Sequence, residues 1–251
     1  MQKKTVSTRI WIPASWPAPD NIHAGTTTRN GGFSGGPYST LNLAGHVGDD
    51  PVDVSRNRQR VITELALPSD PMWLEQVHGN NVIDILSNNR QGSDGAYTNQ
   101  SNYVCAVLTA DCLPLLITDI NGKEIAAIHI GWRGFASNII ASALEMFTAR
   151  PGNLLAWIGP YIYPEHYEVG DEVRDACLNI TPGATQAFQP ARTDHWYANL
   201  ELLVRLQLAE KGLIKVFGGD YCTYRHIDCF YSYRREAVTG RVATMIWMDS
   251  F

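Results

Sequence analysis

Two histidines and one cysteine, far apart in the sequence, are the residues whose types could do chemistry together. They are His78, Cys112 and His129. Imidazole nitrogens and a thiolate are donors that zinc prefers, and three protein ligands leave a fourth position open, as in catalytic zinc sites. Zinc keeps the thiol deprotonated and lowers the pKa of bound water toward neutrality. A single histidine or cysteine is also a common core residue, so the residue types alone leave both interpretations open.

The segment between Cys112 and His129 predicts a β-hairpin that would bring these two side chains together. Two β-branched, apolar runs flank Asn121-Gly122, which is a strong hairpin signal. If these two residues form the loop, Pro114 lies opposite His129, and Cys112 lies diagonal to His129 on the same face. Such diagonal neighbours lie about 7 Å apart at the backbone, a gap that metal bonds of about 2.0–2.3 Å can close. A three-residue loop would move Cys112 to the opposite face.

His78 is predicted to lie where a strand ends and a turn begins. Residues 72–78 are expected to form a strand that turns at 79–81 into a second strand, 82–86, and residues 87–102 are expected to form a polar loop. Further expected elements are an opening strand and a rigid loop in 9–24, a helix from Pro51 to before Pro68, helices at 135–147, 171–178 and 196–211, a loop at 180–195, and strands at 154–158, 213–217 and 242–247. Because strands and helices mix without strict alternation, we expect an α+β fold with mixed β-sheets. Without repeats or a linker, residues 1–251 are expected to form one domain.

Three arginines are candidates for binding the substrate or an anion, and Arg234 and Arg235 are further candidates whose alternative is a solvated surface position. Arg29 lies in a glycine- and hydroxyl-rich loop, residues 25–36, which is either an anion cradle or an ordinary surface turn. Arg133 stands at an expected strand–turn–helix junction, where free N–H groups and the helix dipole favour anions. Arg58 lies on an apolar helical stripe, where it either snorkels to solvent or points into a site.

Length and composition narrow the class of protein. The chain has 251 residues and a formal net charge of −5, which gives no reason to expect nucleic acid or an acidic membrane as the main partner. Its five cysteines lack tight spacing, so we expect free thiols, a reducing compartment and no disulfide framework. The first residues are not followed by an apolar run typical of a signal peptide, and no stretch is long enough to span a membrane. We therefore expect a cytoplasmic monomer or small homo-oligomer.

Several separate motifs, in order along nearly the whole chain, carry a family resemblance. The chain resembles the multicopper polyphenol oxidase (laccase-like) family, also called the laccase-domain purine nucleoside phosphorylase family, which includes the bacterial peptidoglycan editing factor. The motifs are Thr27-Thr28-Arg29-Asn30-Gly31-Gly32, Gln76-Val77-His78-Gly79, Thr109-Ala110-Asp111-Cys112-Leu113-Pro114, His129-Ile130-Gly131-Trp132-Arg133-Gly134, Tyr167-Glu168-Val169-Gly170, Ser232-Tyr233-Arg234-Arg235 and Thr239-Gly240-Arg241. Ile130 stands where the family usually has alanine, and Tyr167 where phenylalanine is common.

The resemblance implies a zinc-dependent enzyme acting on purine nucleosides. It implies that His78, Cys112 and His129 bind one zinc ion, within a fold like that of a bacterial deamidating toxin's catalytic domain, a central β-sandwich flanked by helices. The implied reactions are phosphorolysis of adenosine, inosine, guanosine and methylthioadenosine, and hydrolytic deamination of adenosine. We assign Cys112 and His129 to catalysis and Gln76 to substrate binding. Asp111 is our candidate proton shuttle, with capping of the turn or support of a ligand as its alternative role.

Other functions stay open at this stage. Seven dispersed histidines are too few for several copper centres, so we expect zinc rather than copper, with polyphenol oxidation as the activity that the family's name suggests. In a second alternative, Cys112 is a thiolate nucleophile with His129 as its base, in a metal-free hydrolase that edits nucleotide-linked peptidoglycan precursors. A third alternative is a zinc protein that binds a nucleoside or a partner without turnover.

Overall fold

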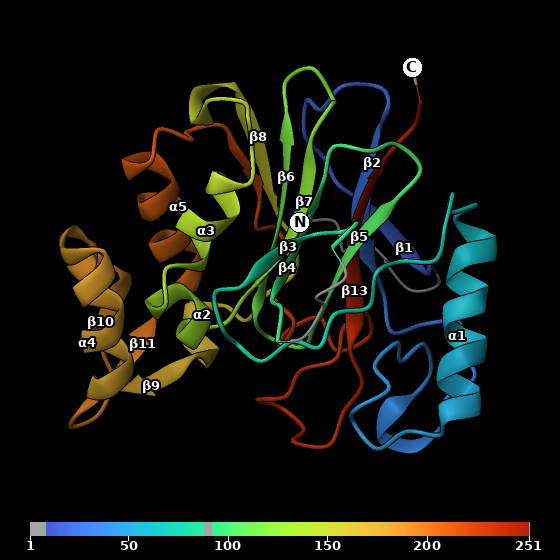
Figure 1. The fold of residues 1–251 in the computed structure, drawn as a ribbon. Coiled ribbons are helices and arrows are strands. Elements are labelled where there is room, and N and C mark those ends of the chain that lie inside the picture. The colour runs from blue at the N-terminus through green and yellow to red at the C-terminus, as the bar shows by residue number, and fades with distance from the viewer. Residues whose placement is uncertain (1–8, 88–91, 251) are drawn as a thin grey trace, which may run out of the picture.

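The structure, a computed structural model, describes residues 9–87 and 92–250. Two β-sheets pack face to face at the centre, with α1 outside one sheet and the remaining helices outside the other (Figure 1). This arrangement confirms the expected α+β class with mixed sheets in a central sandwich flanked by helices. Within the described residues, no helix is both long and apolar enough to cross a membrane.

The larger sheet has six strands, in the order β12-β8-β6-β7-β4-β3, with antiparallel pairs at its centre and parallel pairs at both edges. Its strands are β3 Val82–Asp84, β4 Gly95–Thr98, β6 Leu113–Asp119, β7 Ile125–Ile130, β8 Leu154–Ile158 and β12 Val216–Gly218. The central strands β6 and β7 are buried along their whole length. Both of their faces are therefore covered, which explains why they are continuous apolar runs rather than alternating ones.

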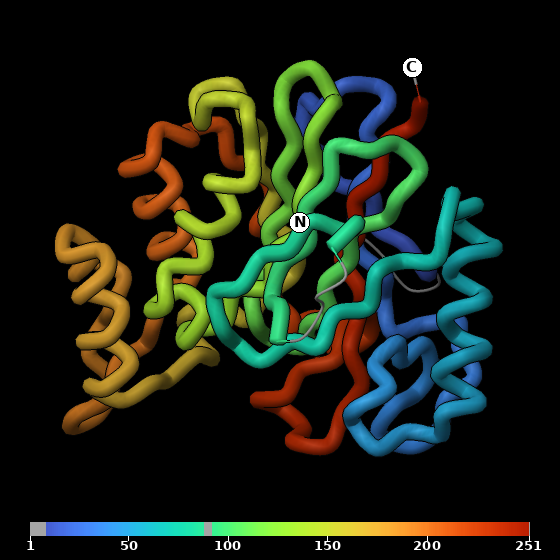
Figure 2. Tube along the Cα trace, viewed as in Figure 1, coloured from blue at the N-terminus to red at the C-terminus, as the bar shows by residue number. Residues whose placement is uncertain are grey.

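The second sheet has four strands, in the order β1-β2-β13-β5, all antiparallel. They are β1 Trp11–Pro13, β2 Ile22–Thr27, β5 Val104–Thr109 and β13 Val242–Met248. Figure 2 shows the C-terminal β13 running through the middle of the molecule, between segments that are far earlier in the sequence. A three-stranded antiparallel sheet lies apart from both, made of β9 Glu168–Gly170, β10 Phe188–Pro190 and β11 His195–Ala198.

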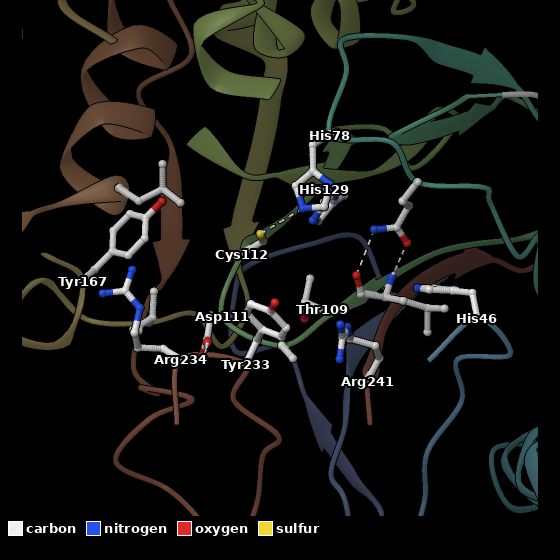
Figure 3. Close-up of a pocket in the computed structure, with 15 residues that line it drawn as sticks. His46, His78, Thr109, Asp111, Cys112, His129, Tyr167, Tyr233, Arg234 and Arg241 are labelled. Carbon is white, nitrogen blue, oxygen red and sulfur yellow. Dashed lines mark hydrogen bonds between the residues drawn. The ribbon is translucent and has the colours of Figure 1, made fainter. Parts of the chain in front are cut away.

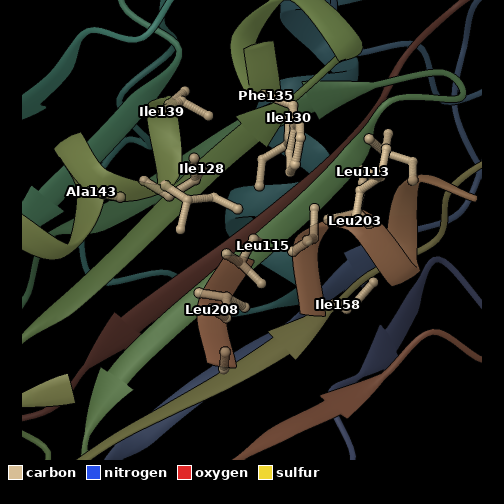
Figure 4. Packing of buried hydrophobic residues seen from close by; sticks show 14 of the residues in the cluster. Leu113, Leu115, Ile128, Ile130, Phe135, Ile139, Ala143, Ile158, Leu203 and Leu208 are labelled. Atoms are coloured by element: carbon tan, nitrogen blue, oxygen red, sulfur yellow. The ribbon is translucent and has the colours of Figure 1, made fainter. Parts of the chain in front are cut away.

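Side-chain alternation along each strand divides the core into layers. In β6, Leu113 and Leu115 pack toward the helices, whereas Leu116 packs into the space between the sheets (Figure 4). In β5, Cys105 faces the other sheet, whereas Ala106 joins the cluster beneath α1. The helices are α1 Pro51–Glu64, α2 Trp132–Ala136, α3 Ile139–Glu145, α4 Asp171–Ile180 and α5 Leu200–Glu210. Each sheet thus buries one face against its partner and one against helices.

The central hairpin has the register predicted from the Asn121-Gly122 pair. Pro114 lies opposite His129, and Thr118 lies opposite Ile125. The carboxylate of Asp119 closes the turn by accepting hydrogen bonds from the backbone N–H groups of residues 121, 123 and 124. The helix expected from Pro51 is also confirmed, because Asp50 caps its first turn by accepting a hydrogen bond from the Val52 N–H.

The expected strand at residues 72–78 is wrong. Only Met72 forms a bridge, to Cys105. Further along, the Gln76 carboxamide accepts a hydrogen bond from the Leu108 N–H and donates one to the Leu108 carbonyl. A side chain thereby takes the backbone groups of β5 that a neighbouring strand would use. The predicted loop at 87–102 is also wrong in part, since β4 begins at Gly95; residues 88–91 lie outside the described residues.

Two predicted helices are shorter than expected, for different physical reasons. The helix expected at 135–147 is broken at Asn138, whose left-handed backbone (φ 67°, ψ 37°) separates α2 from α3. The helix expected at 196–211 begins only at Leu200, because Trp196 pairs with Val169 in the three-stranded sheet. Asn199 caps the new start by accepting a hydrogen bond from the Leu202 N–H.

We expect Leu115→Ala to destabilise the protein by about 2–5 kcal/mol, because its side chain is fully buried between β6 and the helices and a cavity would remain. Urea unfolding measures the loss. The matched control is Ile214→Ala, at a side chain that is 76% exposed, which should change the unfolding free energy by less than about 0.5 kcal/mol. Equal effects of the two changes would contradict the layer assignment.

Candidate metal centre and its cavity

The three predicted ligands converge. One nitrogen of His78, the Cys112 sulfur and one nitrogen of His129 all lie within 4.8 Å of one another. The Cys112 Sγ is 3.8 Å from His78 Nε2, close to the separation of about 3.6 Å that tetrahedral zinc imposes on a thiolate and an imidazole. Figure 3 shows both imidazoles and the sulfur pointing toward a common centre. The donor set and its spacing fit a single metal ion of the zinc type.

Each ligand comes from a different local structure. His129 lies in β7 and is 3% exposed, so its ring is fixed by the sheet. Cys112 lies in the bend just before β6, and His78 lies in a bend with a left-handed backbone, φ 61°. Asp111, which precedes Cys112 in the same bend, has φ 101°. Positive φ at a residue other than glycine is strained, and two of the residues that have it lie at this site.

A single buried carboxylate holds the site together. Asp94 is fully buried, and its Oδ1 is 2.7 Å from His129 Nδ1. The same carboxylate accepts hydrogen bonds from the backbone N–H groups of Val77, His78 and Gly79, at 3.2, 2.9 and 2.7 Å. Because Nδ1 of His129 is bound to the carboxylate, Nε2 is left for a metal, the usual support of a metal-binding imidazole.

The polar groups of the site shift one another's proton affinity. Burial by itself would raise the pKa of the Cys112 thiol, but the charge of His129 and hydrogen bonds from both histidines lower it to about 6. Burial would lower the pKa of His129, but the Cys112 thiolate and the Asp94 carboxylate raise it to about 9. Burial by itself would raise the pKa of the Asp94 carboxyl, but the hydrogen bond and charge of His129, together with the backbone hydrogen bonds from Gly79 and His78, lower it. The site therefore favours a thiolate, the form that binds metal.

The ligands form one end of a cavity of about 510 Å³, a size typical of small-molecule sites. Apolar and aromatic side chains make up much of its wall. Two guanidiniums and the Asp111 carboxylate bring charge to the cavity (Figure 3). The lining residues are His46, Gln76, His78, Leu108, Thr109, Ala110, Asp111, Cys112, His129, Ile162, Tyr167, Leu200, Tyr233, Arg234 and Arg241.

Asp111 and Gln76, both predicted from the sequence, line this cavity. The Asp111 carboxylate accepts a hydrogen bond from the Thr223 hydroxyl at 2.6 Å and another from the Arg234 backbone N–H at 2.7 Å. It thus joins the bend before Cys112 to the C-terminal loop. Gln76 uses both ends of its carboxamide on Leu108 of β5, as described above.

The three arginines predicted to bind substrate are not among the residues that line the cavity. Arg29 donates to the carbonyls of Ser39 and Ile227 and stacks on the Tyr231 ring. Arg58 donates to the Leu43 carbonyl and stacks on an indole. Arg133 is exposed, with its guanidinium over the neighbouring Trp132 ring in a helix of only five residues. The structure thus brings together the ligands, Asp111 and Gln76, but not these three guanidiniums.

Several residues of the site were not assigned to it from the sequence. Asp94 stood in a predicted loop, and its Asp-Gly pair signals a turn rather than a carboxylate that binds an imidazole. His46, Tyr233 and Arg241 reach the cavity from loops distant in the sequence. The signal that could have found Asp94 is chemical, because a metal-binding histidine needs an acceptor for its second ring nitrogen.

Comparisons with known proteins agree on one family. Residues 23–249 match the family described as multi-copper polyphenol oxidoreductase laccase. The chain is 43% identical over 239 residues to the Escherichia coli strain K12 protein named purine nucleoside phosphorylase YfiH, covering 94% of this chain and 98% of that protein. A Haemophilus influenzae protein named purine nucleoside phosphorylase is 39% identical over 241 residues, covering 95% of this chain and 99% of that protein.

Solved structures show the same architecture. A Neisseria meningitidis protein superposes with a TM-score of 0.92 at 39% identity, covering 96% of this chain and all of that chain. YlmD from Geobacillus stearothermophilus superposes with a TM-score of 0.90 at 29% identity, covering all of this chain and 98% of that one.

We expect Asp94→Asn to weaken metal binding by about 10- to 100-fold, because the amide cannot replace the negative charge that holds the His129 ring. Competition with a chromogenic chelator measures the affinity. Asp70→Asn, at an exposed loop position, should bind metal like the parent protein. An unchanged affinity in Asp94→Asn, in protein that unfolds with the parent's cooperativity, would show that this carboxylate does not support the site.

Gly131→Ala should also impair metal binding, but by steric means. A Cβ at this position would lie 2.8 Å from His78 Cδ2 and 3.2 Å from Cys112 Sγ, so it would push two ligands apart. Its φ of −87° suits any residue, so no backbone strain is added. The matched control is Gly152→Ala, where a Cβ meets nothing within 4 Å. Metal stoichiometry after dialysis, measured by atomic emission, should fall in Gly131→Ala only.

Proposed function

The chain belongs to the multi-copper polyphenol oxidoreductase laccase family, and from this premise we propose that it is a purine nucleoside enzyme with one zinc ion. We propose phosphorolysis of adenosine, inosine, guanosine and methylthioadenosine, and hydrolytic deamination of adenosine, as its reactions. The observation that carries the proposal is the convergence of His78, Cys112 and His129 at one end of a cavity sized for a small molecule. The activity in the names of the relatives supports it.

The donor set favours one metal ion over several coppers. In residues 9–87 and 92–250, a single group of three or more histidine, cysteine or carboxylate donors converges. A multicopper oxidase needs several such clusters, rich in histidine. Zinc suits two imidazoles, a thiolate and one open position, and when bound it supplies Lewis-acid chemistry and a nucleophile at neutral pH.

The chain's own residues would bind and orient the nucleoside. Tyr167 and Tyr233 border the cavity, together with the apolar side chains of Ile162 and Leu200. Flat aromatic rings and apolar walls suit a purine base, which stacks on such surfaces. The expected result is a base held between these walls, with its reacting atoms directed to the metal end.

Asp111 is proposed to hold and transfer the proton that either reaction moves. Its carboxylate lies beside Cys112 on the cavity wall, and two hydrogen bonds, from Thr223 and from the Arg234 backbone, fix its orientation. A carboxylate fixed within reach of the reacting atoms is an effective acid–base group. Its bonds to the C-terminal loop also support the alternative role of shaping the bend before Cys112.

A metal-free hydrolase is the second candidate, and one observation favours it. The Cys112 sulfur lies 3.8 Å from Nε2 of His78, and a ring nitrogen of His129, the base in this alternative, lies within 4.8 Å of it. Such an enzyme would be active without stoichiometric metal, and alkylation of Cys112 would abolish its activity. Metal analysis of the active protein therefore separates the two mechanisms.

The decisive assay gives the purified, metal-analysed protein adenosine with and without phosphate. We expect inosine in both conditions, and adenine with ribose phosphate only when phosphate is present. Cys112→Ala and His129→Ala should each lower turnover by at least about 100-fold, because each change removes one of the three ligands from the site. Product chromatography measures every species in one run.

Glu64→Ala is the control, since this exposed side chain at the end of α1 lies away from the cavity. Asp111→Asn should lower kcat with little change in the KM for adenosine if the carboxylate moves a proton. Retained turnover in either ligand variant would overturn the site. Active protein with no bound metal would overturn zinc in favour of the thiol mechanism.

A further inference from the structure

Two guanidiniums bring positive charge to the cavity. Arg234 and Arg241 both line it, and within the described residues neither forms an ion pair with a carboxylate. The Asp111 carboxylate lines the same cavity, but it uses its oxygens on the Thr223 hydroxyl and the Arg234 backbone N–H. A charged group that is partly removed from water, as Arg241 is, needs compensation, and a ligand can supply it.

Arg241 is the better placed of the two guanidiniums. Its side chain is half-buried, and its Nη1 donates to the carbonyls of Thr239 and Gly240. These two bonds hold the group by one nitrogen, while Nε and Nη2 have no hydrogen-bond partner among the described residues. Its guanidinium lies 5.9 Å from the Tyr233 ring centroid. Two N–H groups in a fixed fork match two oxygens of a phosphate.

The surroundings of Arg241 place it opposite the metal ligands. Burial lowers the pKa of Arg241, and the charges of Cys112 and Asp111 oppose this shift. Burial also lowers the pKa of His46, and the charges of Arg241 and Arg58 lower it further, so that this imidazole is neutral and can accept or donate a hydrogen bond. Figure 3 shows Arg241 at the end of the cavity near His46, across from the His78 and His129 rings.

Arg234 lies at the same end of the cavity as Arg241, on the other side of Tyr233. Its Nη1 donates to the carbonyls of His166 and Glu168, at 3.4 and 3.0 Å, and its guanidinium lies 5.4 Å from the Tyr167 ring centroid. It is exposed at the mouth of the cavity. Figure 3 shows the two guanidiniums on either side of Tyr233. Both are held by neutral carbonyls, so their charge remains available to an anion that enters.

We propose that Arg241, assisted by Arg234, forms a phosphate-binding subsite that faces the metal ligands across the cavity. The proposal rests on the proposed function, in which phosphate is a substrate. Phosphate held there lies on the far side of the bound nucleoside from the metal end, and its oxygens are directed into the cavity. The phosphate is either free inorganic phosphate or the phosphate group of a nucleotide, since both present the same dianion to the same fork.

Titration with inorganic phosphate tests the subsite without turnover. Metal-loaded protein is titrated by isothermal calorimetry and by phosphorus NMR. Arg241→Gln should weaken phosphate binding by at least about tenfold, because it removes a charge-assisted bidentate contact. Arg241→Lys should give an intermediate loss, since it keeps the charge but not the fork. The control is Arg56→Gln, an exposed arginine on α1, with affinity like that of the parent protein.

The lysine variant keeps the test valid if Arg241→Gln does not fold, because it retains a cation at the same place. Arg234→Gln should give a smaller loss, as this group is exposed. The proposal is overturned if the parent protein does not bind phosphate at millimolar concentrations, or if all three variants bind it as the parent does.

Two further arms identify the source of the phosphate. If adenosine at saturation leaves phosphate binding intact, inorganic phosphate is the ligand. If adenosine monophosphate binds more tightly than adenosine, and Arg241→Gln abolishes that difference, the phosphate of a nucleotide is the ligand. Phosphate binding through Arg241 without any phosphorolysis would refute the proposed reaction and leave the subsite standing. Phosphorolysis with an unchanged KM for phosphate in Arg241→Gln would refute the subsite and leave the proposed reaction standing.

Discussion

The Asp94 carboxylate is the interaction on which the site depends. It joins two segments that the sequence separates, because it binds the His129 ring in β7 and also three successive backbone N–H groups around His78. Without it, three backbone N–H groups in the bend that carries His78 would lose their acceptor. The same negative charge increases the basicity of His129. The Asp94 carboxylate therefore fixes the positions of His78 and His129 and also raises the basicity of His129.

The hairpin of β6 and β7 supplies the rest of the geometry through its register. The pairing of Pro114 with His129 sets where the strand ends, and the bend at Asp111 then turns Cys112 toward the histidines. Gly131 faces this junction, and it is the absence of a side chain there that leaves room for His78 and Cys112. Sheet, bend and glycine together create a space for one ion, with no flexible element needed.

Sequence reasoning succeeded where the signal was local and failed where tertiary contacts decided. The Asn121-Gly122 turn determines its own hairpin, and Asp50 caps its own helix, so both were predictable. The strand expected around Gln76 failed because a side chain, rather than a main chain, occupies the edge of β5. The helix expected at 135–147 failed at Asn138, whose left-handed backbone no periodicity reveals. Asp94 supports His129, which lies 35 positions further along the chain. Local sequence patterns do not reveal contacts between residues so far apart.

The distribution of charge gives the cavity a direction. At one end, Asp94 and the Cys112 thiolate place negative charge around the metal ligands; at the other, Arg241 and Arg234 are held only by carbonyls. This charge distribution does little for the binding of a neutral nucleoside alone. It favours a nucleoside that binds together with an anion. Arg241 is half-buried, so keeping its guanidinium in place costs solvation. A phosphate bound there, as we propose, would compensate that charge.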